Sequence, residues 1–201
     1  MLVYDQILER VENYKDLGYE KPMIEKFNKD NLQSVSYDVT IGNKIRRFKN
    51  EMETISLTSK NDIDDLYEEV NIEYGYKMRP GEFILARLNE KVNMPNDIAG
   101  HIRPRTTFNK LGIIITSQHI NPSYSGNLQI GIRNCTPNVV ILKNDLKIGQ
   151  IVFEKVDGEI REDMLYKNKK DAKYHNEDEF VGSKVYNETK IQNYLGEIFG
   201  L

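Results

Sequence analysis

Hydrophobic residues recur at helical spacing at the start of the chain and at shorter intervals over much of the rest. Ile7, Val11 and Tyr14 lie three or four positions apart among polar residues, and Gly18 follows at a plausible helix end. This spacing predicts one short N-terminal helix. A second helix is expected over residues 61–70, where acidic side chains near the start suit the helix dipole.

From Ser36 onward, short apolar runs alternate with turn residues. Residues 37–41 alternate in polarity and stop at Gly42, and residues 82–86 follow the turn signal Pro80-Gly81. Strands this short, without βαβ alternation, predict a mainly β fold of the sandwich or distorted-barrel type. Further strands are expected at 98–102, 112–116, 127–133, 139–142 and 148–154.

Composition narrows the range of functions. The chain has 201 residues, enough for one sizeable core, and its net charge of −3 gives no general attraction to nucleic acid or to an anionic membrane. A single cysteine, Cys135, excludes a disulfide within the chain and a zinc deaminase motif, and we expect it to be a buried small apolar residue. With no long apolar run and no leader-like start, a cytoplasmic location is expected.

The chain changes character at about residue 161. Four lysines between 167 and 173 precede the acidic run Glu177-Asp178-Glu179. We therefore divide the chain into a β domain with its N-terminal helix, residues 1–160, and a tail of the same domain, residues 161–201. The tail is either an arm that closes over a site or a solvated surface segment.

Several common catalytic motifs are missing from the sequence. It has no phosphate-binding G-x-x-x-x-G-K-[ST] loop, no G-x-G-x-x-G, no H-E-x-x-H and no G-x-S-x-G. The three histidines, His101, His119 and His175, have no metal-ligand spacing. Common ATPases, dehydrogenases, serine hydrolases and zinc enzymes are thereby excluded.

Six stretches carry a more specific pattern through their order and spacing. They read YDVTIGNK (37–44), RPGEFILA (79–86), RPRTTFNKLG (103–112), HINPSYSG (119–126), LKIGQIVF (146–153) and DAKYHN (171–176). Together they resemble the dCTP deaminase family, which shares its fold and trimeric assembly with the dUTPases. The resemblance implies a dUTPase-like, distorted β-barrel or jelly-roll fold with small helical insertions. It also implies a homotrimer whose sites lie between subunits.

The same resemblance implies which residues contact a nucleotide. Arg105, Thr106 and Thr107 match the family's Arg-Ser-Ser phosphate motif, and threonine keeps the hydroxyl that serine offers. Lys110 stands where an arginine is usual and keeps the charge without the bidentate fork. Mg²⁺ bound to the phosphates is expected, and zinc is not. The other expected contacts are His119, Asn121, Gln129, Tyr166, Lys173 and Tyr174.

Two carboxylates of the family pattern are replaced in this chain. The position of the catalytic glutamate, which activates the attacking water, is Gly131, and that of a nearby aspartate is Asn121. A general base contributes about 10²–10⁴ in rate, so its loss argues against ordinary deamination. Glu177, where the family has a tail glutamine, is the first replacement to consider. Gly131 is also expected to enlarge the pocket, because it has no side chain.

Three interpretations follow from these residues. The first is a homotrimer that senses or sequesters a nucleotide with little or no deamination, a pseudoenzyme. The second is an active dCTP deaminase of pyrimidine deoxynucleotide metabolism, which makes dUTP and ammonia and in one variant continues to dUMP. The third is a protein-interaction scaffold. No membrane or nucleic-acid partner is expected.

Overall fold

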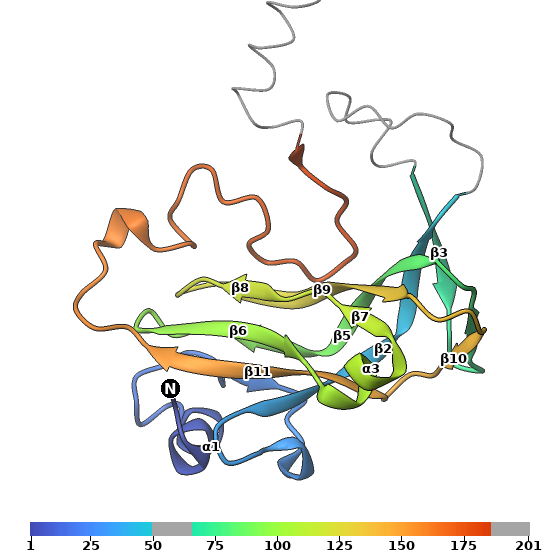
Figure 1. Ribbon diagram of the computed structural model, residues 1–201. Coiled ribbons are helices and arrows are strands. Elements are labelled where there is room, and N and C mark those ends of the chain that lie inside the picture. The colour runs from blue at the N-terminus through green and yellow to red at the C-terminus, as the bar shows by residue number, and fades with distance from the viewer. Residues whose placement is uncertain (50–65, 186–201) are drawn as a thin grey trace, which may run out of the picture.

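The computed structural model describes residues 1–49 and 66–185 and confirms a mainly β fold with one short N-terminal helix and small helical insertions (Figure 1). The helical elements are α1 (Tyr4–Glu12), η1 (Lys29–Asn31), α3 (Thr106–Leu111) and η2 (Glu162–Met164). The strands are β1 (Ile24–Glu25), β2 (Tyr37–Phe48), β3 (Tyr67–Asn71), β4 (Tyr76–Met78), β5 (Phe83–Asn93), β6 (Ile98–Pro104), β7 (Ile113–Ile115), β8 (Gln118–Ile120), β9 (Ser125–Asn134), β10 (Val140–Leu142) and β11 (Lys147–Lys155).

Nine of these strands form one antiparallel sheet that curls round the core. Its main order is β7-β9-β5-β2-β11-β6-β8, with β1 added beside β5 and β3 beside β2. β4 and β10 form a separate two-stranded sheet. Figure 1 shows α1 on one side of the strands and the tail after β11 on the other. This topology leaves the outer face of β5, β8 and β9 for the tail to cover.

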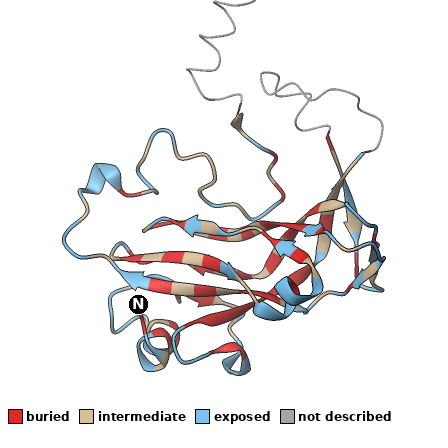
Figure 2. Ribbon diagram, viewed as in Figure 1, coloured by how far each residue is buried: buried red, intermediate tan, exposed pale blue. Residues whose placement is uncertain are grey.

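Alternation along the strands builds the core. Every second residue of β5 is buried from Ile84 to Val92, and Figure 2 shows the same banding on other strands. The residues between them point outward and carry polar groups such as Arg87 and Lys91. Because the side-chain period of a strand is two, one register fixes both the core and the outer face.

β2 continues past the point where the sequence predicted its end. It runs through Gly42 and on to Phe48, with a shift in its register against β5 between Ile41 and Ile45. A Cβ on Gly42 would lie 2.9 Å from the backbone oxygen of Arg87. The glycine therefore permits a close approach at a bulge, which bends the strand instead of ending it.

The second predicted helix is wrong over residues 67–70, while residues 61–65 lie outside the described part of the chain. Tyr67–Asn71 is a strand, β3, that pairs with β2. Cross-strand pairs of opposite charge hold it there, including Arg47 with Glu68. Glu68 and Glu69, at the end of the predicted helix, thus serve as partners for the basic residues of β2, while the acidic residues near its start lie outside the described residues.

The N-terminal helix is confirmed, although it ends at Glu12, before Gly18. Ile7 and Val11 are buried against the sheet as their spacing predicted. Cys135, in contrast, is exposed just after β9, so the expectation of a buried apolar cysteine was wrong. Within the described residues, no helix is long and apolar enough to cross a membrane.

Candidate functional site

A pocket of about 390 Å³ lies between β8, the first half of β9 and the tail. Its volume falls in the range of small-molecule sites. Several residues predicted from the sequence meet in it, although they come from three separate segments. Its lining consists of Leu85, Gln118, His119, Ile120, Asn121, Tyr124, Leu128, Gln129, Tyr166, Tyr174, Glu177, Val181, Gly182 and Ser183.

The tail reaches the pocket through backbone pairing with the start of β9. The Asn176 amide donates to the Ser125 carbonyl at 2.8 Å, and the Asn127 amide donates to the Glu177 carbonyl at 2.7 Å. Gly126 makes this approach possible, since a Cβ there would lie 3.0 Å from the Glu177 nitrogen. Its φ of 154° also favours glycine. The pairing places the Glu177 side chain in the pocket.

Glu177 is the carboxyl group of the pocket. Gln129 Nε2 donates to its Oε1 at 3.4 Å, and the Tyr124 hydroxyl donates to its Oε2 at 3.5 Å. Burial raises its pKa to about 7, and the positive charge of Lys184 and the Tyr124 hydrogen bond only partly oppose that shift. A carboxyl with this pKa can take or give a proton near neutral pH.

Three tyrosines form the aromatic wall of the pocket. The rings of Tyr124 and Tyr166 are 5.9 Å apart, and the Tyr166 hydroxyl accepts a hydrogen bond from the Tyr174 amide at 3.1 Å. Burial raises the pKa of Tyr124, and the nearby Glu177 carboxyl adds to the effect. The Tyr124 hydroxyl is therefore neutral and acts as a donor. Such a wall offers flat apolar surface with polar tips, which suits a heterocyclic base.

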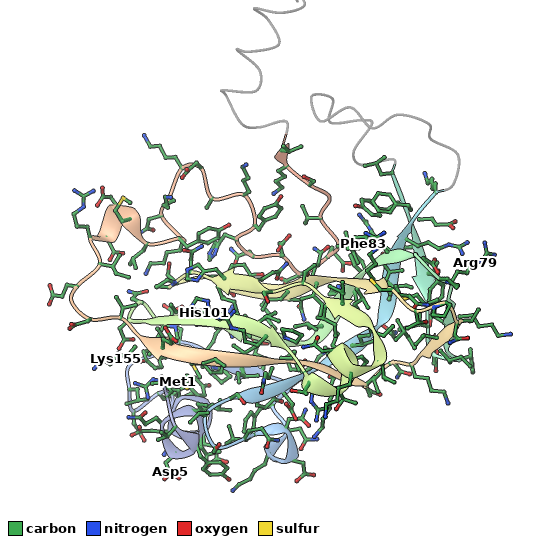
Figure 3. All side chains as sticks on the ribbon, viewed as in Figure 1. Met1, Asp5, Arg79, Phe83, His101 and Lys155 are labelled. Atoms are coloured by element: carbon green, nitrogen blue, oxygen red, sulfur yellow. The ribbon has the colours of Figure 1, made fainter. Side chains whose placement is uncertain are left out.

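The opposite wall carries amides and an imidazole. Gln118 Nε2 donates to the Gln129 carbonyl at 2.6 Å, which ties β8 to β9 beside the pocket. His119 is exposed on β8, and its ring lies 4.9 Å from that of His101 on β6, which Figure 3 labels. Asn121 is exposed in the turn after β8, where its carbonyl accepts from the Tyr124 amide at 3.2 Å. These groups offer both donors and acceptors to a ligand.

Gly131 does not enlarge the pocket, contrary to the expectation from its missing side chain. A Cβ built there would lie 2.6 Å from Cε2 of Phe83 and 2.9 Å from Cγ2 of Thr116. The Phe83 ring, labelled in Figure 3, thus fills the space that a side chain at this position would need. Gly131 also does not line the pocket. The strand therefore presents neither a carboxylate nor an opening at this point.

The predicted phosphate-binding residues lie elsewhere. Arg105, Thr106, Thr107 and Lys110 belong to α3 and its start, and they do not line this pocket. The Arg105 guanidinium instead lies 3.7 Å from the buried Asp38 carboxylate and donates to the Lys147 carbonyl at 3.2 Å.

Lys173 is adjacent to Tyr174 in the tail, outside the lining residues. Its carbonyl accepts a hydrogen bond from Lys184 Nζ. The chain thus places an aromatic pocket at the tail and a basic, hydroxyl-bearing helix elsewhere.

Tyr124 and Gln118 are polar residues of the pocket that sequence reasoning missed although each had a signal. Tyr124 lies in the turn between Asn121 and Gly126, where an aromatic residue belongs to the quoted pattern. Gln118 directly precedes His119, which was predicted. Val181, Gly182 and Ser183 had no signal, because only the path of the tail brings them to the pocket.

Comparison with known proteins identifies relatives of this chain. A family model described as dCTP deaminase-like matches residues 4–156. The dUMP-forming dCTP deaminase of Dictyoglomus turgidum is 31% identical over 158 residues, which cover 77% of this chain and 80% of that protein. The dCTP deaminase of Buchnera aphidicola is 29% identical over 170 residues, covering 79% of this chain and 86% of that protein.

A solved structure shares the fold. The 2'-deoxycytidine 5'-triphosphate deaminase from Agrobacterium tumefaciens superposes with a TM-score of 0.58 at 17% identity, covering 78% of this chain. This chain spans 49% of that longer chain.

Proposed function

We propose, given that this chain belongs to the dCTP deaminase-like family, that it binds a pyrimidine deoxynucleotide in the pocket beneath its tail with little or no deamination. The observation that carries the proposal is the convergence of Tyr124, Tyr166 and Tyr174 with Gln129 and Glu177 around a cavity of about 390 Å³. Gly131, packed against Phe83, supports the absence of ordinary deamination, because no general base stands on that strand.

The phosphates are proposed to bind across a subunit boundary. α3 carries Arg105, Thr106, Thr107 and Lys110, of which the two threonines and Lys110 are exposed. In a homotrimer, α3 of one protomer would supply these groups to the nucleotide held by its neighbour. Arg105 and Lys110 would offset the phosphate charge, and the hydroxyl groups would donate hydrogen bonds.

Mg²⁺ is proposed to arrive with the nucleotide. Among the described residues, no three His, Cys, Asp or Glu side chains are grouped so that they could hold a metal ion. Mg²⁺ bound mainly by phosphate oxygens and water needs few protein ligands, so the donor set here is compatible with it. The ion would neutralise phosphate charge, and no zinc is proposed.

The tail, residues 161–201, is proposed to act as an arm of the single domain that closes the pocket. Its described part already contributes Tyr166, Tyr174 and Glu177 to the lining. Closure would exclude water from the base. We place this activity in the cytoplasm, where reduced thiols and deoxynucleotides occur together.

A second candidate function is deamination with Glu177 as the base, and one observation favours it. The Glu177 carboxyl lies in the pocket with a pKa of about 7. Ionised, it could take a proton from water attacking C4 of cytosine and pass it to N3, then move the second proton of that water to the departing amine, so that dCTP and water give dUTP and ammonia. A pKa near the working pH suits both transfers.

One experiment separates these possibilities. Purified protein is mixed with dCTP, dUTP or dTTP and Mg²⁺, and thermal stability and ammonia release are followed together. A ligand bound only by the folded state raises the melting temperature, so stabilisation without ammonia supports the binding protein. Ammonia release that disappears in Glu177→Gln supports the deaminase. If none of the three nucleotides raises the melting temperature, both the binding protein and the deaminase are refuted, and the protein-interaction scaffold is favoured.

Lys110→Gln gives a sharper test of the proposed phosphate site than Arg105→Ala. Lys110 is exposed on α3, so its replacement leaves the fold intact, whereas Arg105 faces buried Asp38. Loss of one phosphate contact is expected to weaken nucleotide binding about tenfold. Lys77→Gln, at the exposed position of β4, removes the same charge elsewhere and serves as the control. Equal affinities of the two variants would place the phosphates away from α3.

A further inference from the structure

The outer face of β5 carries two cations directly beneath the tail. Arg87 Nη1 donates to the Asp178 carbonyl at 2.5 Å and lies 3.5 Å from the Glu179 carboxylate. Lys91 Nζ lies 2.5 Å from the Asp178 carboxylate. Both cations are largely covered, with side-chain exposures of 24% for Arg87 and 18% for Lys91.

The segment after Glu177 is held by further contacts on the same face. Gln129 Nε2 donates to the Glu179 carbonyl at 3.3 Å. Phe180 is buried, and the guanidinium of Arg46 lies 5.0 Å from the centre of its ring. Glu177 is thus flanked by backbone pairing to β9 on one side and by cations of β5 on the other.

The acidic run 177–179 of the tail lies against the sheet although it carries three like charges. Three acidic residues in a row repel one another and usually stay in solvent. Here Asp178 and Glu179 turn to Arg87 and Lys91, while Glu177 points into the pocket. The carboxylates themselves stay largely exposed, at 59% for Asp178 and 81% for Glu179, so their ion pairs are weak. The bond from the covered Arg87 guanidinium to the Asp178 carbonyl is the stronger contact that can hold the tail.

We propose that Arg87 and Lys91 are positioning residues, which seat the acidic segment of the tail and thereby place the Glu177 carboxyl in the pocket. Neither residue lines the pocket, so both act through the tail. The seating itself stands on contacts within one chain. Only its consequence for a bound nucleotide rests on the proposed function.

Hydrogen exchange on the nucleotide-free protein tests the seating directly. The Asn127 and Asn176 amides donate across the contact between β9 and the tail, so their protection reports whether the tail is seated. In Arg87→Gln we expect both amides to exchange about tenfold faster, the effect of losing one charge-assisted hydrogen bond. In Lys91→Gln we expect exchange a few-fold faster, because the Asp178 carboxylate it loses is 59% exposed. Lys77→Gln on β4 loses the same charge and should leave them unchanged.

A charge exchange separates seating from general destabilisation. Lys91→Glu should release the tail, and the double variant Lys91→Glu with Asp178→Lys should restore protection at Asn127, because the pair is reformed in reverse. Failure of the double variant to recover, or unchanged exchange in Arg87→Gln and Lys91→Gln, overturns the proposal.

The pKa of Glu177 in Arg87→Gln distinguishes two roles for Arg87, because seating the tail and simply adding positive charge shift that pKa in opposite directions. If Arg87 only added positive charge near a seated Glu177, its removal would raise the pKa of the carboxyl. If Arg87 seats the tail, Arg87→Gln lets Glu177 into water and lowers its pKa from about 7 toward the ordinary value. A rise therefore overturns the proposal. All these measurements omit nucleotide, so they stay decisive even if the pocket binds none.

Discussion

Restoring a carboxylate at Gly131 tests the packing of this strand most directly. The new Cβ in Gly131→Glu would lie 2.6 Å from Cε2 and 2.7 Å from Cζ of Phe83, and 2.9 Å from Cγ2 of Thr116. No real Cβ tolerates such contacts, so the ring must move. The strand is also fixed, since the Gly131 amide donates to Thr116 Oγ1 at 2.8 Å. Phe83 is the part of this cluster that is most able to shift.

The expected cost follows from overpacking. Gly131→Glu should lower the free energy of unfolding by about 1–3 kcal/mol. Phe83→Leu removes the atoms that collide and costs about 1 kcal/mol on its own through lost packing, which includes its contact with Phe48. In the double variant the collision with the Phe83 ring is gone, while the close approach to Thr116 Cγ2 at 2.9 Å remains. Its loss should therefore be smaller than the sum of the two single losses by about 1 kcal/mol.

Urea denaturation of the parent protein, Gly131→Glu, Phe83→Leu and the double variant measures the coupling between the two positions. Ammonia release from dCTP measures whether the new carboxylate acts as a general base. Only the double variant presents a carboxylate with room to reach the pocket, and a general base is worth about 10²–10⁴ in rate. Gly131→Gln with Phe83→Leu has the same size without the carboxylate and is the matched control. Additive losses in stability would refute the packing argument, and equal ammonia release by the Glu and Gln double variants would refute the chemical one.

Three further predictions rest on single contacts. Seating of the tail should weaken by at least about tenfold as pH rises from about 4.5 to 7. The Glu177 carboxyl has a pKa of about 7 in the seated tail and an ordinary pKa of 4.5 in water, so the proton it holds favours the seated state and is lost over this range. Exchange at Asn127, corrected for intrinsic rates, measures this, and Glu177→Gln should remove it. Arg105→Ala should lower the free energy of unfolding by about 1 kcal/mol in urea, because it strips buried Asp38 of its cation; Arg105→Lys should recover part of the loss. Gly126→Ala should release the tail, since its Cβ would lie 3.0 Å from the Glu177 nitrogen and 3.1 Å from the Glu177 oxygen, and unchanged exchange at Asn127 would contradict that role.

Much of the fold could be predicted because it depends on local patterns. Apolar alternation gave the positions of most strands, and Ile7 and Val11 marked the buried face of the helix. The errors arose where a distant segment decided the outcome. Gly42 looked like a strand end, but the backbone of β5 passes close to it and the strand bends. Residues 67–70 looked helical, but β2 offered them a paired edge.

The site was predictable only for residues that keep a recognisable pattern. His119, Asn121, Gln129, Tyr166, Tyr174 and Glu177 line the pocket. The contact between Phe83 and Gly131 could not be foreseen, because cross-strand neighbours depend on register and the ring orientation depends on packing. Likewise, nothing in the sequence pairs Arg87 or Lys91 with residues some ninety positions later, as the observed separations of 91 and 87 positions show.

The position of Glu177 on the tail has a thermodynamic consequence. A carboxylate on β9 would be fixed by the sheet, whereas Glu177 enters the pocket only when the tail is seated. Any ligand that contacts Tyr166, Tyr174 or Glu177 must therefore bind the seated state more tightly than the released one. Because the apparent affinity of such a ligand scales with the fraction of molecules whose tail is seated, whatever lowers that fraction weakens ligand binding in proportion. Charge changes at Arg87 and Lys91 should thus alter nucleotide affinity without either residue lining the pocket.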